Sequence, residues 1–267
     1  MGAAATAKLD LGNDKPITIH KVTMDQPWVW LKAGWKDLTR CPGTSIGYGI
    51  IWVVLSLILV IGLWMADQGS WLLPLFAGFM LMGPLVAVGT YDMSRELDQG
   101  GTPSLGQALF VWRRNATQIA LMGVLLMIFL LAWIRFATLL FALFFGVSIP
   151  AVETSLVYTE LLQSGTGVGL IIVGSAIGAV LAFTAFALSV VSVPRLLDKP
   201  ETSVLEAAIT SLAVVKHNFK PMLLWGVILS AVTFAGLAMG LIGLAVALPV
   251  LGHASWRAYK DLVENGD

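Results

Sequence analysis

Twenty consecutive uncharged residues run from Ile46 to Met65, with the sequence IGYGIIWVVLSLILVIGLWM. The hydrocarbon core of a bilayer is about 30 Å thick, and a helix needs roughly 20 apolar residues to cross it. The run therefore predicts a transmembrane helix. The 24 residues at the start of the chain are polar or mixed, so the apolar run begins too late for a cleaved signal peptide. We expect this first span to be an uncleaved anchor.

The composition of the whole chain supports a membrane protein. Of its 267 residues 57% are hydrophobic and 12% are charged, whereas a soluble domain carries roughly 25% charged residues. So few charges cannot cover a water-soluble surface. The 16 Lys and Arg balance the 16 Asp and Glu, which argues against a nucleic-acid partner. The predicted partner is the lipid bilayer.

Further apolar runs extend this pattern along the chain. The last of them, from Met222 to about Ser255, is too long for one span, and the glycines between 236 and 243 offer a turn. We therefore predict an all-α membrane protein with six transmembrane helices, arranged as three antiparallel hairpins. A polar N-terminal tail (1–24) precedes one membrane domain (25–267), whose hairpins lie at about 46–91, 116–193 and 219–256.

The basic residues predict the orientation of these helices. Fifteen of the 16 Lys and Arg fall on one side of the predicted spans, and Arg135 is the exception. The outer turns hold no basic residue and three acidic ones, Asp67, Glu153 and Glu160. By the positive-inside rule, both termini are expected in the cytoplasm.

Each hairpin is preceded by a segment that we expect to form a cytoplasmic interfacial amphipathic helix. The first has apolar residues at helical spacing (Trp28, Leu31, Trp35, Leu38). The second segment opens at Thr102-Pro103-Ser104 and ends at Arg113-Arg114-Asn115. The third opens with a capping box, Ser203 and Glu206, and ends at Lys216.

The segments that follow each hairpin also resemble one another. Arg95-x-Leu97-Asp98 and Arg195-x-Leu197-Asp198 share a pattern at a spacing of 100 residues. Pro249, Trp256, Lys260 and Leu262 fall in register with Pro84, Tyr91, Arg95 and Leu97. A threefold internal repeat explains these matches. The alternative is that any cytoplasmic junction uses such residues. Under both interpretations Arg95, Asp98, Arg195 and Asp198 are candidate structural or partner-binding residues.

Arg135 is the one basic residue inside a predicted span. An arginine at the bilayer centre is costly and is by default functional. At its place along the helix it can instead reach the outer headgroups or pair with Asp67, Glu153 or Glu160. Both interpretations stay open.

Two other features are candidates for chemistry. His253 and His217 lie near the cytoplasmic ends of the last two predicted spans, where paired histidines could ligate haem or a metal. We expect interfacial hydrogen bonding instead. Residues 43–47 spell G-x-S-x-G, but a membrane helix follows and no strand precedes it, so the match indicates a helix start.

The remaining features argue against an enzyme. No acidic residue falls inside a predicted span, and no Walker loop, H-E-x-x-H motif or cysteine cluster is present, since Cys41 is the one cysteine. We expect no cofactor and no metal. The small-residue stripes Gly174–Gly178–Ala182 and Gly236–Gly240 indicate close helix packing, either within the chain or in a dimer.

Four runs carry a family resemblance: residues 91–98, 131–146, 186–194 and 251–259. Over roughly Pro27 to Val263 the chain resembles a proteobacterial family of integral membrane proteins of unknown function. Some of its members are labelled as related to cytochrome c oxidase subunit I. The resemblance implies a six-span protein of the bacterial inner membrane. Oxidase subunit I has about twelve spans and several intramembrane histidines, whereas this chain has three histidines in all.

Three functional hypotheses follow. The first is a non-enzymatic accessory or assembly subunit of a larger membrane complex, such as a respiratory oxidase. The second is a channel or carrier for a small neutral or apolar solute. The third is a lipid-handling protein whose interfacial helices hold headgroups.

Overall fold

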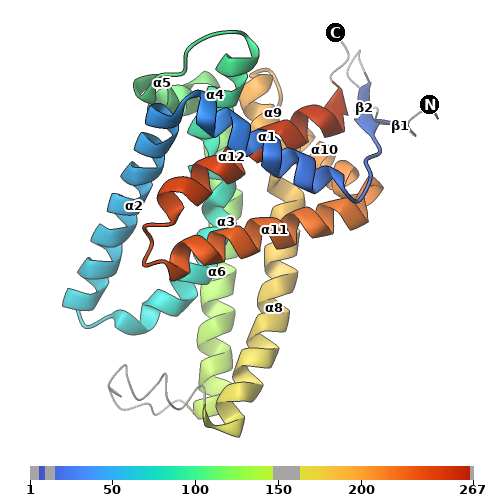
Figure 1. The fold of residues 1–267 in the computed structure, drawn as a ribbon. Coiled ribbons are helices and arrows are strands. Elements are labelled where there is room, and N and C mark those ends of the chain that lie inside the picture. The colour runs from blue at the N-terminus through green and yellow to red at the C-terminus, as the bar shows by residue number, and fades with distance from the viewer. Residues whose placement is uncertain (1–5, 10–15, 147–162, 265–267) are drawn as a thin grey trace.

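The computed structural model describes residues 6–9, 16–146 and 163–264. These residues are mostly helical (Figure 1). The helices are α1 (Gln26–Arg40), α2 (Pro42–Met65), η1 (Gly69–Trp71), α3 (Leu72–Val86), α4 (Val88–Asp98), α5 (Leu105–Phe110), η2 (Val111–Asn115), α6 (Ala116–Phe145), α8 (Gly165–Ser189), α9 (Ser192–Asp198), α10 (Val204–His217), α11 (Phe219–Ala238) and α12 (Leu244–Leu262). The strands are β1 (Thr6–Leu9), β2 (Ile17–His20) and β3 (Val263–Glu264).

Four helical stretches within the described residues are long and apolar enough to cross a membrane. They are Pro42–Met65, Leu105–Phe145, Gly165–Asp198 and Phe219–Ala238. They include four of the six spans expected from the sequence. The helical membrane architecture is therefore confirmed, while the six spans, the hairpins and the threefold repeat stay predictions.

The two other expected spans differ from the four in length or in composition. α3 has 15 residues, about 22 Å at the usual rise of a helix, and the helix is interrupted at Ala87 before α4 begins. Pro84 lies inside α3 and cannot donate the backbone hydrogen bond that a regular helix requires. α12 is long enough, but its last turns carry Arg257, Lys260 and Asp261.

α12 has 13 buried residues and is packed against α1, α2, α4 and α11. Glycines make the close approaches possible. A Cβ at Gly34 of α1 would lie 2.5 Å from the carbonyl oxygen of Val250 and 2.6 Å from the backbone nitrogen of Ala254. A Cβ at Gly49 of α2 would collide with the backbone of Ala245, and one at Gly252 with Thr90 of α4. α12 is thus the central helix of the fold, wrapped by elements from the start of the chain.

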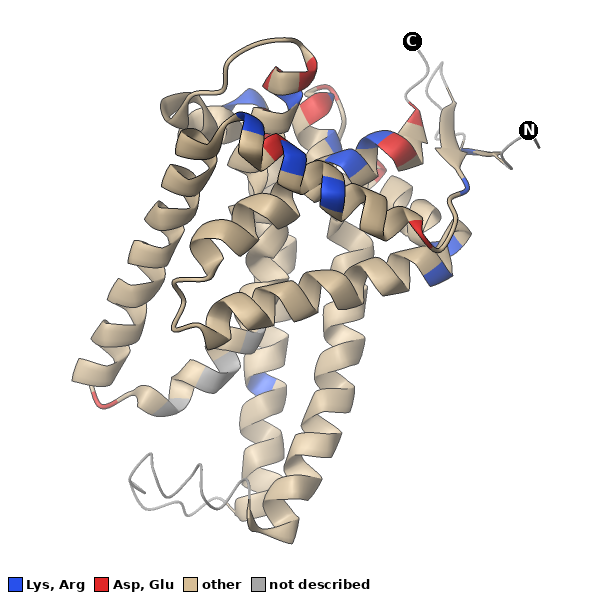
Figure 2. Ribbon diagram, viewed as in Figure 1, with Lys and Arg blue, Asp and Glu red and all other residues tan. Residues whose placement is uncertain are grey.

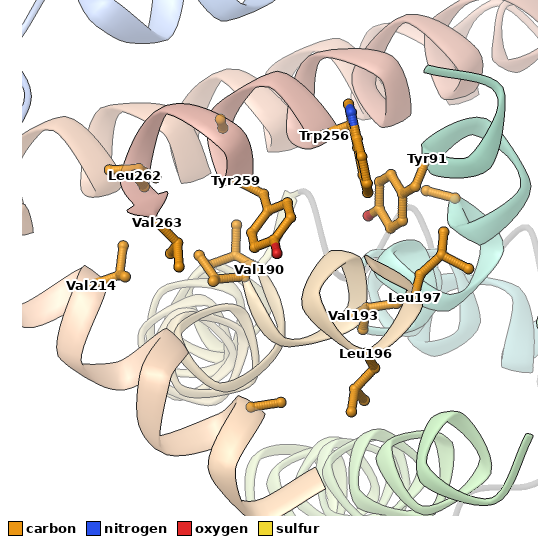
Figure 3. Packing of buried hydrophobic residues seen from close by; sticks show 14 of the residues in the cluster. Tyr91, Val190, Val193, Leu196, Leu197, Val214, Trp256, Tyr259, Leu262 and Val263 are labelled. Carbon is orange, nitrogen blue, oxygen red and sulfur yellow. The ribbon is translucent and has the colours of Figure 1, made fainter. Parts of the chain in front are cut away.

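The main hydrophobic core lies where α12 meets α4, α9 and α10. Figure 3 shows Tyr259 of α12 close to Val190 and Val193, and Trp256 beside Tyr91. The ring centroids of Trp256 and Tyr259 are 5.5 Å apart, and both side chains are almost completely buried. These large aromatic side chains contribute much of the buried area in this region.

A small antiparallel sheet joins the two ends of the described chain, in the order β1-β2-β3. Ile19 of β2 pairs with both Ala7 of β1 and Val263 of β3. Ile17 and Ile19 are buried in the main core. The expected N-terminal tail therefore contributes ordered strands, which departs from a purely α-helical fold. Such short strands leave little sequence signal, and β2 is completed by a partner at the far end of the described chain, β3.

Helices occupy all three segments expected before the hairpins: α1, α5 with η2, and α10. The predicted capping box at Ser203 and Glu206 is present in full, and Ser104 accepts a hydrogen bond from the Gln107 amide. The apolar residues expected on α1 divide between an exposed face and a buried one. Trp28 and Trp35 are exposed, and the buried stripe is Pro27, Trp30, Gly34, Asp37 and Leu38. α12 fits against that stripe because Gly34 admits its backbone.

Charged side chains gather at one end of the molecule, on α1, α4, α9, α10 and α12 (Figure 2). We call this region the charge-rich end. α2, α6 and α8 run away from it, and α6 and α8 extend furthest (Figure 1).

Candidate functional site

A buried polar network surrounds His253 on the inner face of α12. The ring nitrogen Nδ1 lies 2.7 Å from the Ser94 hydroxyl, and Nε2 lies 2.9 Å from the Ser45 hydroxyl. All three residues have no measurable exposure. The Ser94 hydroxyl also donates to a carboxylate oxygen of Asp37 at 3.0 Å, and Ser45 lies 3.3 Å from Cys41 Sγ. The network thus connects α1, α2, α4 and α12.

His253 makes hydrogen bonds, as expected, and it is completely buried because α1, α2 and α4 cover α12. No hydrogen bond or ion pair joins His253 to His217 in the described part of the chain. The G-x-S-x-G segment does begin a helix, as predicted, since α2 starts at Pro42. Its Ser45 contacts a histidine, but the other ring nitrogen faces the Ser94 hydroxyl. Ser45, Ser94 and His253 are closed off from solvent, whereas Cys41 at the edge of the network is partly exposed.

An ion-pair cluster lies beside this network at the charge-rich end. Arg257 of α12 bonds to Asp37 through its Nε atom at 2.7 Å and to Asp98 of α4 through its Nη1 atom at 2.5 Å. Burial alone would lower the pKa of Arg257, but hydrogen bonds to Asp98 and Asp37 outweigh it and raise this pKa. The guanidinium is therefore a permanent positive charge between two carboxylates.

The candidate residues Asp98 and Asp198 both bind α12. Asp98 accepts a hydrogen bond from Trp256 Nε1 at 3.0 Å. Asp198 of α9 accepts one from the Tyr259 hydroxyl at 2.9 Å and lies 3.5 Å from Lys260 Nζ. Each aspartate thus receives one aromatic donor and one cation from consecutive residues of α12. These contacts hold the fold together.

The candidate arginines behave differently from one another. Arg95 is buried and pairs with Asp92 at 2.9 Å and with Glu96 at 3.0 Å. Arg195 is 8% exposed on α9, within the charge-rich end. Arg135 is exposed on α6, and no ion pair to Asp67 is present. The other two predicted partners of Arg135, Glu153 and Glu160, lie outside the described residues.

A cavity of about 640 Å³ opens between α3, α8, α11 and α12. This volume falls in the range of small-molecule sites, about 300 to 1,000 Å³. Small side chains on α8 create the space, namely Ala179, Ala182 and Ala185. Opposite them, the α11 side chains Leu223, Val227 and Phe234 line the cavity and are themselves exposed. The cavity therefore has an apolar, laterally accessible wall.

Two glycines of the small-residue stripes are in close contact with other parts of the chain. A Cβ at Gly178 would lie 2.8 Å from the Trp133 ring of α6, and a Cβ at Gly236 would lie 3.2 Å from the backbone nitrogen of Leu244. Gly178 and Gly236 thus pack helices within the chain, as one of the two predicted interpretations states, whereas nothing lies within 4 Å of a Cβ at Gly240. Ala182, one turn beyond Gly178, instead faces the cavity.

Sequence reasoning missed Asp37, Arg257, Ser94 and the cavity. Asp37 carried a usable signal, because it shares a helical stripe with Trp30, Gly34 and Leu38, and a carboxylate on a buried stripe requires a partner. Within the described residues, no group of three or more His, Cys, Asp or Glu is placed to hold a metal ion.

The matched part of the chain begins at the first residue of α3 and ends at the last residue of α9. Residues 72–198 match the DUF2189 family. Its model is described as a predicted integral membrane protein and covers just under half of the chain. The resemblance to a family of uncharacterised membrane proteins is thereby confirmed, while its proteobacterial and oxidase-related labels stay predictions. Comparisons with curated proteins and with solved structures found no match.

The DUF2189 region contains one wall of the cavity and both aspartates that hold α12. α3 and α8 lie inside it, and so do Asp98 and Asp198. α1, α2, α11 and α12 lie outside it. The His253 network is therefore completed by parts of the chain that the family model does not cover.

Proposed function

We propose that the protein is a multi-pass membrane protein that binds a small neutral or apolar solute between its helices and carries it within the bilayer. The observation that carries this proposal is the cavity of about 640 Å³ between α3, α8, α11 and α12. α8 and α11 belong to stretches that can cross a membrane. A cavity at this level favours apolar molecules that are already dissolved in the bilayer.

The exposed apolar wall supports entry from the side. Val227 and Phe234 of α11 are 57% and 66% exposed while lining the cavity. In a bilayer such side chains contact lipid chains, so a solute can enter without crossing water.

A cavity-filling variant tests this proposal. Ala182 is exposed and lines the cavity, so the ring in Ala182→Phe occupies the open volume. Val180→Phe is the matched control, because Val180 is 67% exposed on the same helix and does not line the cavity. Native mass spectrometry of protein purified in nanodiscs is expected to detect retained apolar molecules on the wild type and on Val180→Phe, but not on Ala182→Phe. Equal retention by all three proteins would overturn the proposal.

We further infer six spans in a bacterial inner membrane, with both termini and the charge-rich end in the cytoplasm. The support is the charge distribution, since 15 of 16 basic residues lie on one side of the six predicted spans. Fusions of alkaline phosphatase after Met65 and after Asp98 test this orientation. The first fusion is expected to be active and the second inactive, and the reverse result would contradict it.

An accessory or assembly role beside a larger membrane complex is the second candidate, and the far end of α6 favours it. α6 continues for ten residues beyond Arg135, about 15 Å. Leu139 and Leu143 in this extension are 64% and 78% exposed. If Arg135 lies at the outer headgroups, this apolar surface projects beyond the bilayer, where a partner subunit would cover it. Purification from native membranes in mild detergent tests this role, and consistent elution as a lone monomer contradicts it.

We also propose that the protein is not an enzyme. Ser45 and Ser94 both contact His253 and could be read as a nucleophile beside a base, and the complete burial of all three side chains supports this proposal. A lipid-handling role remains compatible with the exposed Trp28 and Trp35 of α1.

A further inference from the structure

The wall of the cavity carries no charge. None of its lining residues is Asp, Glu, Lys, Arg or His. A carboxylate or phosphate bound inside it would lose its hydration without gaining a counter-ion, which is strongly unfavourable. The cavity therefore selects against anionic lipids, including fatty acids in their ionised form.

Hydroxyl groups cluster at the end of the cavity that is nearest the charge-rich end. Tyr91 comes from α4, Ser189 from the last turn of α8, and Ser255 from α12. These residues are 3%, 1% and 6% exposed. Tyr91 directly precedes Asp92, and Ser255 lies two residues before Arg257. α3 and α11 contribute mostly apolar side chains to the rest of the wall. Two further hydroxyls, Ser230 and Thr233 of α11, also line the cavity but are less buried than the other three.

The hydroxyls retain hydrogen-bonding capacity. Ser189 donates its proton to the Ala185 carbonyl at 2.7 Å, which leaves its oxygen as an acceptor. Tyr91 and Ser255 each contribute a hydroxyl to the cavity wall. A hydroxyl has one donor proton and two acceptor lone pairs, so a hydrogen bond between the two would still leave one donor and free lone pairs. This pair can therefore both donate to and accept from one neutral polar group.

We propose that the ligand of this cavity is an uncharged amphiphile, with an apolar chain and one hydroxyl or carbonyl head that binds at Tyr91 and Ser255. This inference rests on the proposed function and names its substrate class. The head lies at the hydroxyl end and the chain lies along α8 and α11. Several lipids share this chemistry, among them long-chain alcohols, isoprenoid alcohols and quinones.

Photoreactive probes separate this inference from the proposed function. Three diazirine-bearing molecules with the same chain are used: hexadecane, 1-hexadecanol and hexadecanoate at pH 8. Each is added to the full-length protein in phosphatidylcholine nanodiscs, and crosslinked peptides of α8 and α11 are quantified against probe concentration. Half-maximal labelling is expected at the lowest probe concentration for 1-hexadecanol, at a higher one for hexadecane and at the highest for hexadecanoate. Ala182→Phe abolishes this labelling, whereas Val180→Phe does not.

The head-group contact is tested with Tyr91→Phe and Ser255→Ala. Each variant is expected to raise the alcohol concentration needed for half-maximal labelling about fivefold, the effect of one lost hydrogen bond. Labelling by hexadecane is expected to stay unchanged, which also shows that the cavity is intact. An unchanged response of the alcohol in both variants, or stronger labelling by hexadecanoate, overturns the inference alone. Absence of labelling by all three probes in the wild type overturns the proposed function itself.

If the inference holds, the natural ligand is identified by extracting the lipids that remain bound to protein purified from native membranes. Enrichment of an isoprenoid quinone, an isoprenoid alcohol or a simple long-chain alcohol over the bulk membrane identifies it. Enrichment of anionic lipids that Ala182→Phe removes contradicts the inference.

Discussion

The Nε2 atom of His253 lies 2.9 Å from the Ser45 hydroxyl, although 208 residues separate them in the chain. The contact joins the start of α2 to the middle of α12. Because Ser94 of α4 occupies the other ring nitrogen, one imidazole links three helices. Loss of this ring removes one hydrogen-bond partner from each of two buried hydroxyls.

His253→Leu is therefore expected to destabilise the protein by about 2 kcal/mol, the usual penalty for unsatisfied buried polar groups. Thermal unfolding in detergent, followed by tryptophan fluorescence, measures the effect. His20→Leu is the control, since His20 contacts Glu264 at the surface and its loss is expected to change stability little. Equal unfolding temperatures for His253→Leu and the wild type would show that the network contributes nothing.

Asp37→Asn is expected to cost about 3 kcal/mol, because it leaves the half-buried Arg257 with a single carboxylate partner, Asp98. The double variant Asp37→Asn/Arg257→Met should be less destabilised than the sum of the two single variants, because neither charge is then left unpaired. Asp25→Asn serves as the exposed control. Strict additivity of the two single effects would show that the ion pair is not coupled.

Gly34→Ala is expected to destabilise the protein by about 1 to 3 kcal/mol, the range for overpacked sites. The added Cβ would lie 2.5 Å from the Val250 carbonyl oxygen, so α1 and α12 must separate. Gly62→Ala on α2 is the matched control, because nothing lies within 4 Å of its added Cβ. A lower unfolding temperature is expected for Gly34→Ala alone; the opposite ranking would contradict the packing of α12.

Cys41 provides a test of thiol chemistry and of orientation. Burial raises the pKa of the Cys41 thiol, and the negative charge of Asp37 raises it further. Since the thiolate is the reactive form, alkylation by a membrane-impermeant maleimide at pH 7 is expected to be slower than for glutathione. The rate should rise with pH and become normal in SDS. If Cys41 in the folded protein were alkylated as fast as free glutathione, the result would contradict the raised pKa of the thiol.

The same reagent reports on the side of the membrane that Cys41 occupies. Cys41 is the single cysteine of the chain, so no background variant is required. Labelling is expected in inside-out vesicles and not in intact spheroplasts. Labelling in intact spheroplasts would reverse the proposed orientation.

Much of the helical layout could be predicted locally. α2, α6 and α11 match the apolar runs, and the Ser203 capping box fixes the start of α10. The interruption between α11 and α12 also falls where the glycines indicate, with Gly240 at φ +67°. Each of these features depends on residues that are close together in the sequence, and it can therefore be recognised from a short stretch of the chain.

The sequence by itself determined that the solvent of this protein is a bilayer, that several of its helices are long and apolar enough to cross it, and where the charges lie along the chain. Each property depends on composition and on runs of about 20 residues. Only the tertiary structure decided that α12 is a buried central helix, that Asp98 and Asp198 bind it, and that a cavity lies beside Ala182. The physical reason is that burial, ion pairing and empty space depend on which distant surfaces meet, and apolar periodicity does not distinguish a face that contacts lipid from one that contacts another helix.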